Sequence, residues 1–344
     1  MTGSTGTGRT GHSGKGNTGS TGDTGAASVR AYAAITLQSL ITGFSFMFLK
    51  IALQSADTFD LLAHRFTLAA LSVLLFALLR PGALRIRFRD FLKILPYGIA
   101  YPLVFFLFQT LGMTQISSSQ AGIIYAVVPI LTVIAAGMLL GEKIRGTQAF
   151  FMLLSVAGVI FINIMNGFNL KNYSFAGFFL ILISAVSLAL YNVLVRRLTG
   201  DYTPLAIACV MNITGFLFFN VIALARHTAA GTVTDYFIPF ASPSFLVAVL
   251  FLGVLSSLIT SLLSAFALKT LQAVRVGLFN NVGTIVSILA GTLFLHEEFR
   301  WYHLPGIIAI LTGTIAFNLI GNGGKRESGE EDAASGPQKQ KTED

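Results

Sequence analysis

The sequence predicts an all-α integral membrane protein with ten transmembrane helices, arranged as two inverted repeats of five helices. Three observations carry this prediction: an apolar composition, ten apolar segments of membrane-spanning length, and a similarity between the two halves of the chain. Of the 344 residues, 54% are hydrophobic and 11% are charged, against about 25% charged in a soluble domain. A water-soluble core cannot be this apolar, which excludes a soluble enzyme, a secreted disulfide scaffold and a disordered chain.

The charge and the cysteine content limit the partners and the covalent or metal sites that the chain can have. Lys and Arg number 23 and Asp and Glu 15, a net charge of +8, and most basic residues lie in short stretches between apolar segments. Membrane topology signals are placed in this way, so we expect a lipid bilayer as partner and no nucleic acid. Cys209 is the one cysteine, which excludes an intramolecular disulfide and a thiolate metal cluster.

The ends of the chain are polar. Residues 1–28 are almost all Gly, Thr and Ser, and residues 322–344 are rich in charges of both signs. Neither composition can supply a core, so both segments are predicted to be disordered tails.

Ten apolar segments lie between these tails, each close to the roughly 20 residues with which a helix crosses the hydrocarbon. Backbone groups in lipid must be paired internally, and the segments lack the alternating polarity of barrel strands, so we expect helices. The segments are residues 31–53, 58–79, 91–113, 118–140, 147–165, 175–195, 204–225, 244–268, 271–295 and 301–320.

Basic residues between the segments predict the orientation. Ten crossings place both tails on one side, together with the Arg-rich loop at residues 80–93. Loops on the other side hold only Lys171, Arg226 and Arg300. Because basic loops stay inside, we expect both termini to be cytoplasmic, in a multi-pass protein of a plasma or bacterial inner membrane.

An internal repeat organises the chain. A shift of 155 residues aligns 110–165 with 265–320 without a gap, placing Glu142 on Glu297 and Arg145 on Arg300. We therefore divide the chain into a first repeat at residues 29–166 and a second at residues 167–321. Five helices are an odd number, so the second repeat enters the membrane inverted, as in many secondary transporters with a midplane substrate site. The alternative is a duplication retained for stability alone.

The stretch SSSQAGIIYAVVPILTVIAAGMLLGEKIRGTQAFFMLLSVAGVIFI resembles the EamA domain of the drug/metabolite transporter (DMT) superfamily. The motif residues are Pro129, Gly141, Glu142 and, in the second half, Glu297, with glycines at 158 and 313. Thr284 and His296 depart from the pattern, where a proline and a glycine would fall. DTFDLLAHRF is similar to the family's second helix, with Arg65. The resemblance covers roughly residues 31–320 and implies transport of a small metabolite, without specifying which.

Polar and aromatic side chains at helical spacing are our candidates for a substrate cavity. In lipid, such groups must face other helices or water, and uncharged ones suit a small amphiphilic solute. Interhelical hydrogen bonding is the alternative role for each. The candidates are Tyr101, Phe105, Gln109, Tyr125, Tyr191, Asn192, Ser257, Asn280, Asn281 and Thr284.

Three residues near helix ends are candidates for the mouth or for coupling: Lys50, His64 and Arg65. Histidine titrates near neutral pH, and arginine can hold a carboxylate with two hydrogen bonds. The alternatives are an interfacial position for His64 and a pairing of Arg65 with Asp57 or Asp60. Glu142 and Glu297 are interpreted as structural braces that meet helix N–H groups or a nearby arginine.

Enzyme chemistry has no support in the sequence. The five histidines lack metal-ligand spacing, and there is no P-loop, so we expect no metal, no cofactor and no ATP driving. We predict a secondary transporter of a small organic molecule that works by alternating access, and the resemblance favours export of amino acids or related metabolites. The alternatives are uptake or exchange of nucleotide-linked or phosphorylated solutes, and a non-transporting scaffold or sensor. A GxxxG pair, Gly137 and Gly141, leaves a homodimer open.

Overall fold

The computed structural model describes residues 20–79, 86–116, 121, 124–165, 174–294 and 299–334, and within these ranges it contains helices and no strands. The first half contains α1 (Ser20–Ala52), α2 (Thr58–Leu79), α3 (Phe88–Gly98), the π-helical η1 (Ile99–Val104), α4 (Phe105–Met113), α6 (Val128–Leu140) and α7 (Gly146–Met165). The second contains α8 (Phe175–Leu198), α9 (Pro204–Ala230), the 3₁₀-helical η3 (Val233–Ala241), α10 (Pro243–Leu250), the π-helical η4 (Phe251–Ile259), α11 (Thr260–Thr270), α12 (Ala273–Phe294) and α13 (His303–Ala334).

The all-helical prediction is confirmed. Among the described residues, nine helices are long and apolar enough to cross a membrane, and each coincides with one of the ten predicted segments. Two of them are composite: Phe88–Met113 runs through α3, η1 and α4, and Pro243–Thr270 runs through α10, η4 and α11. The segment predicted at residues 118–140 contains the shorter α6, and its residues 118–120, 122 and 123 lie outside the described ranges.

Both terminal helices extend into the segments predicted to be disordered. α1 begins at Ser20 and α13 continues to Ala334, so helix bounds include residues 20–28 and 322–334 of the predicted tails. Extending an existing helix adds one hydrogen bond per residue without a new nucleus, and the added segments contain good helix formers such as Ala, Glu and Lys.

Irregular backbone occurs in both composite helices. Tyr101 has extended dihedral angles, φ −147° and ψ 120°, which is the region favoured for a residue before a proline such as Pro102. η4 widens the other composite helix, and π-helical turns of this kind are frequent at functional sites. These breaks place Tyr101, and Ser256 of η4, on the wall of an interior cavity.

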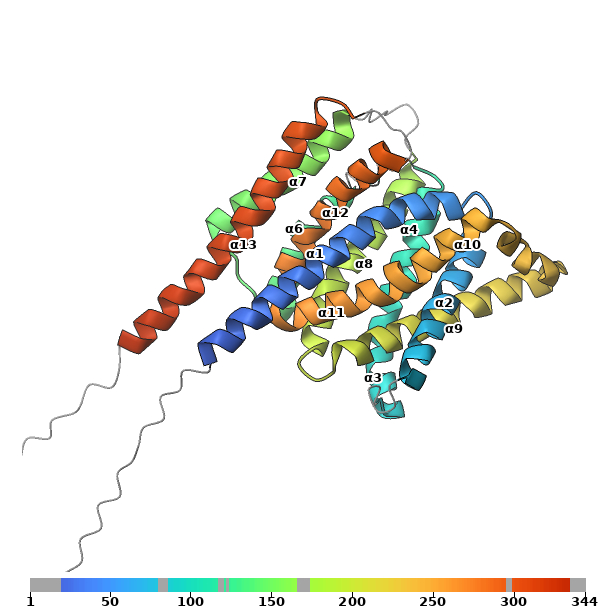
Figure 1. The fold of residues 1–344 in the computed structure, drawn as a ribbon, viewed down its shortest axis with the longest axis horizontal. Coiled ribbons are helices and arrows are strands. Elements are labelled where there is room, and N and C mark those ends of the chain that lie inside the picture. The colour runs from blue at the N-terminus through green and yellow to red at the C-terminus, as the bar shows by residue number, and fades with distance from the viewer. Residues whose placement is uncertain are drawn as a thin grey trace, which may run out of the picture.

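α7 and α13 form an antiparallel pair at one edge of the bundle in Figure 1, and α2 and α9 lie at the opposite edge. The pair is close because it meets through glycines: a Cβ atom on Gly158 would lie 2.8 Å from the Gly306 carbonyl oxygen. By contrast, a Cβ atom on Gly137 would lie 3.7 Å from the Glu142 carbonyl oxygen, and one on Gly141, which ends α6 with φ 66°, would have no neighbour within 4 Å. In the described residues, the GxxxG pair therefore packs against no other helix.

The two ends of the bundle are held by different polar contacts. At the end where α1 stops and α2 starts, Arg226 pairs with Asp57 at 2.9 Å, and Nε2 of His227 lies 3.0 Å from Oδ2 of Asp60. At the opposite end, Arg196 donates to the carbonyl of Leu268 at 2.5 Å. There, too, Arg275 donates to the Tyr32 hydroxyl at 2.9 Å, which donates to Asn318 at 3.2 Å. These contacts fix α1 to α12 and α13 at that end.

Candidate functional site

A cavity of about 560 Å³ lies inside the helix bundle. Its walls come from both halves of the chain: α1, α2, η1, α4 and α7 from the first, and α8, η4, α11, α12 and the start of α13 from the second. The size is that of a small-molecule pocket. The lining uses the last part of α1, from Gln38 to Lys50, and the first part of α2, so the cavity lies towards the end where these two helices meet.

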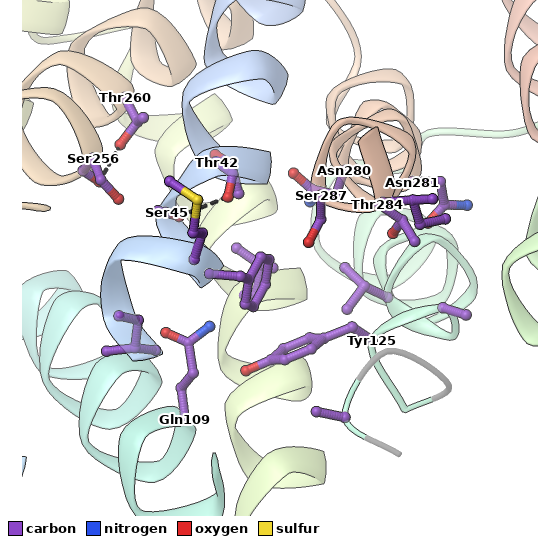
Figure 2. A pocket seen from close by; sticks show the side chains of 18 of the residues that line it. Thr42, Ser45, Gln109, Tyr125, Ser256, Thr260, Asn280, Asn281, Thr284 and Ser287 are labelled. Carbon is purple, nitrogen blue, oxygen red and sulfur yellow. Dashed lines mark hydrogen bonds between the residues drawn. The ribbon is translucent and has the colours of Figure 1, made fainter. Parts of the chain in front are cut away.

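Hydroxyl and amide side chains form one wall of the cavity. α12 contributes Asn280, Thr284 and Ser287 at helical spacing, and α1 contributes Thr42 and Ser45. In Figure 2, Gln109 and Tyr125 lie across the space from these residues, so polar groups face the cavity from several helices. Such groups can bind the polar parts of a solute that is too hydrophilic to cross lipid by itself.

Aromatic rings form a second part of the lining. The Tyr101 and Tyr191 rings lie 4.0 Å apart between centroids, and the Tyr101 and Phe105 rings 5.0 Å apart. The Tyr125 hydroxyl is 2.8 Å from Oγ of Ser184. These contacts place three tyrosines from separate elements around one space and give it an apolar surface with polar tips.

Arg65 supplies a buried charge at the cavity wall. Its side chain comes from α2 and is only 3% exposed. Nε donates to Oγ of Ser257 at 2.7 Å, and Nη2 donates to Oγ of Ser256 at 2.9 Å. The guanidinium carbon lies 4.2 Å from the centre of the Phe106 ring. Arg65 therefore pairs with neither Asp57 nor Asp60, the acids that the sequence offered as partners.

Nine of the ten cavity candidates line the cavity, together with Lys50 and Arg65. Ser257 is the exception, because it is buried behind Arg65 and hydrogen-bonded to it. His64 does not line the cavity either. Its ring lies 4.2 Å from that of Tyr236, and Nε2 is 2.9 Å from the Tyr236 carbonyl oxygen. His64 is thus buried beneath η3, a short helix in a stretch where no apolar segment was predicted.

Several polar residues of the lining are not among the candidates, including Gln38, Thr42, Ser45 and Asn163. The first three recur at i, i+4 and i+7 on α1, which is the spacing of Asn280, Thr284 and Ser287 on α12. The same pattern could therefore have identified them. Asn163 aligns with Asn318 in the internal repeat and carries no further signal.

The motif residues shape the ends of α6. Pro129 lies in its first turn, where a missing N–H costs least, and Gly141 ends it in a left-handed conformation. Burial raises the pKa of the Glu142 carboxyl, while the backbone N–H groups at Ala273 and Val274 and the Arg196 charge oppose this. Glu142 thus faces the start of α12 in the other half, and its Oε1 atom lies 4.0 Å from Nε of Arg196. Glu297 lies outside the described residues.

The family model of the EamA-like transporter family matches residues 29–164 and 175–319. The chain belongs to the EamA-like transporter family. This confirms the resemblance of its motifs to the EamA domain. The described residues contain no group of three or more His, Cys, Asp or Glu side chains that could hold a metal ion.

Relatives of this EamA-family chain carry transporter names without a substrate. It is 46% identical to the uncharacterized transporter YcxC of Bacillus subtilis, over 84% of the chain and 93% of that protein. It is 24% identical to the uncharacterized transporter YetK of the same organism, over 82% of the chain and 85% of that protein. One crystal structure has the same fold, with TM-score 0.68 and 19% identity over 86% of the chain and 99% of its own length. The protein is therefore a multi-pass membrane transporter.

Proposed function

We propose that this transporter moves a small organic metabolite by alternating access without ATP, and that it exports amino acids or related metabolites. The cavity carries the proposal, because it is a polar space enclosed by apolar helices and lined from both halves of the chain. A scaffold needs no such space. The candidate residues of its lining, with Lys50 and Arg65, are proposed as the substrate site.

The packing of α7 and α13 supports two inverted five-helix repeats and ten crossings. A Cβ atom on Gly158 would meet Gly306 and Ile310, and one on Gly313 would meet Phe151 and Ser155. These two sets of contacts are related by the shift of 155 residues found in the sequence. The shift places Gly158 on Gly313, and it places Phe151 and Ser155 on Gly306 and Ile310. A contact that maps onto itself when the two partners are exchanged is typical of two-fold symmetry. The two helices are antiparallel, as inverted repeats require.

The two ends of the helix bundle differ in a way that supports alternating access. The cavity lies towards the end where α1 meets α2, and the Arg275–Tyr32–Asn318 contacts hold α1 at the opposite end. In the proposed orientation, with both termini cytoplasmic, this is an outward-facing state. Transport then requires the Tyr32 contacts to separate while the outer end closes.

A flux assay tests the proposal. The protein is reconstituted in liposomes loaded in turn with labelled amino acids, nucleotide sugars and sugar phosphates, and efflux is followed. We expect saturable efflux of amino acids. Ser287→Trp, which fills the cavity, should abolish it. Leu289→Trp on the same helix is the matched control, because this side chain is 44% exposed on the outside of the bundle.

Three results would refute the proposal. One is the absence of flux for every class of solute, which would favour the scaffold or sensor. Another is flux through Ser287→Trp equal to that of the unmodified protein, because solutes would then bypass the cavity. Efflux of nucleotide sugars or sugar phosphates in place of amino acids would select the alternative substrate class.

A further inference from the structure

The charge of the cavity lining is one-sided. Among the residues that the structure describes, the lining includes the basic side chains of Lys50, Arg65 and Arg300, together with His303, but no Asp or Glu. Lys50 is at the exposed end of α1, whereas Arg65 lies deep in the wall. The solute therefore meets a fixed positive charge without a fixed negative one.

Arg65 has neutral hydrogen-bond partners only. Its Nε and Nη2 atoms bond to Ser256 and Ser257, and within the described chain no oxygen accepts from its Nη1 atom. A charge held among membrane-spanning helices costs free energy unless an opposite charge or water compensates it. Serine hydroxyls and the Phe106 ring compensate it incompletely, so an anion in the cavity would complete the pairing.

A second donor points to the same ligand chemistry. Asn192 is a residue of the cavity lining, and its buried Nδ2 atom has no hydrogen-bond partner among the described residues. The Asn192 side chain is only 2% exposed, so bulk water does not satisfy this group. A buried donor without a partner is costly, and an oxygen of the bound solute would satisfy it. Nη1 of Arg65 and Nδ2 of Asn192 thus both lack an acceptor among the described residues.

We infer that the cavity binds the carboxylate of an organic acid, with Arg65 as its counter-charge. The inference rests on the proposed function, because it assigns the substrate class of the same cavity. Amino acids qualify through their carboxylate, and so do 2-oxo and 2-hydroxy acids. A doubly charged phosphate fits less well, because the other Lys and Arg residues of the described lining, Lys50 and Arg300, are exposed and do not lie deep in the wall as Arg65 does.

Matched acids and amides test the inference. Binding of benzoate, L-lactate and N-acetyl-L-leucine to the full-length protein in nanodiscs is measured by calorimetry, each beside its carboxamide. We expect at least one acid to bind at least tenfold more tightly than its amide, because the amide leaves Arg65 unpaired. Arg65→Gln should reduce this ratio to below twofold, and Arg65→Lys should retain a preference for the acid. If Arg65→Gln does not fold, the inference is tested by the acid–amide ratio of the unmodified protein and by that of the Arg65→Lys variant.

Arg226→Gln is the matched control, because it removes the same charge outside the cavity and should leave the ratio unchanged. The inference is overturned if no acid binds, if amides bind as well as acids, or if Arg65→Gln keeps the preference. The flux assay separates it from the proposed function. Acids that bind through Arg65 but never cross the membrane would refute transport alone, and flux without acid preference would refute the inference alone.

Discussion

Gly313 of α13 lies directly against the backbone of Phe151 in α7: a Cβ atom at Gly313 would be 2.5 Å from the Phe151 carbonyl oxygen. It would also be 2.6 Å from the Ser155 nitrogen. Both neighbours are backbone atoms, which cannot move without shifting the helix. The contact therefore requires glycine, and the symmetric contact at Gly158 has the same requirement.

We expect Gly313→Ala to destabilise the protein by about 1–3 kcal/mol, the usual cost of overpacking a close contact. The measurement is thermal unfolding of the purified protein in detergent. Gly146→Ala is the control, because a Cβ atom there would have no neighbour within 4 Å. Alanine also favours helices over glycine, so the control should be neutral or stabilising. Equal stability of the two variants would contradict the close contact of α7 and α13.

The Asp57–Arg226 pair predicts a pH-dependent contribution to stability. Burial alone would raise the pKa of the Asp57 carboxyl, but the Arg226 hydrogen bond and charge and two backbone N–H groups hold it below 3.8. A carboxyl with a lowered folded-state pKa stabilises the protein above its unfolded pKa. This stabilisation is lost as the pH falls through the folded-state pKa.

We expect Asp57→Asn to lower stability at pH 7, by less than about 1 kcal/mol because the pair is half exposed and screened by solvent. The difference from the unmodified protein should shrink as the pH falls below 3.8. Asparagine can still accept the N–H groups of Phe59 and Asp60 through Oδ1, so the change removes the charge and the Arg226 contact but keeps these two backbone contacts. Unfolding curves from pH 3 to pH 7 provide the measurement. A difference that persists at low pH would show that the charge is not the cause.

Two neighbouring amides of α12 separate transport from packing. Asn281 is 3% exposed and donates to Oγ of Ser155 at 3.1 Å, whereas Asn280 is less buried, and no described residue forms a hydrogen bond with it. We therefore expect Asn280→Ala to reduce flux at least tenfold with little change in melting temperature. Asn281→Ala should lower both, because it leaves the Ser155 contact broken. The prediction fails if Asn280→Ala keeps full flux or loses stability as Asn281→Ala does.

The helices could be predicted because apolar length is a local property. The prediction of 58–79 coincides with Thr58–Leu79, but that of 204–225 falls short of Pro204–Ala230. The predicted segment ends before the first charged residue, Arg226. The helix itself continues to Ala230 and is capped by Gly231, whose φ is 69°. The short η3 was missed because its nine residues contain no periodic signal long enough to read.

The cavity candidates could be predicted because polar groups in an apolar helix need a polar neighbour or water. Which neighbour they meet depends on how the helices pack, and helical spacing does not contain that information. Ser257 meets Arg65, 192 positions away in the sequence, and His64 meets Tyr236, 172 positions away. Glu142 likewise faces α12 of the other half, which no local motif indicates.

The Tyr32 hydroxyl links α1 to both α12 and α13. It accepts from Arg275 at 2.9 Å and donates to Asn318 at 3.2 Å. Each such bond contributes about 0.5–1.5 kcal/mol, and 1.4 kcal/mol corresponds to about tenfold in an equilibrium. If this end must open during transport, Tyr32→Phe should increase the open population severalfold.

A cysteine at Ile35 measures that opening. Ile35 is 0% exposed and lies in α1 between Tyr32 and the cavity-lining Gln38, so a maleimide reaches it only when this end separates. With Cys209→Ala as background, Ile35→Cys should be labelled severalfold faster in the Tyr32→Phe variant. Tyr202→Phe is the control, because the Tyr202 hydroxyl forms no hydrogen bond with any described residue. If Ile35→Cys is labelled at the same rate with Tyr32→Phe as with Tyr202→Phe, Tyr32 does not hold this end closed.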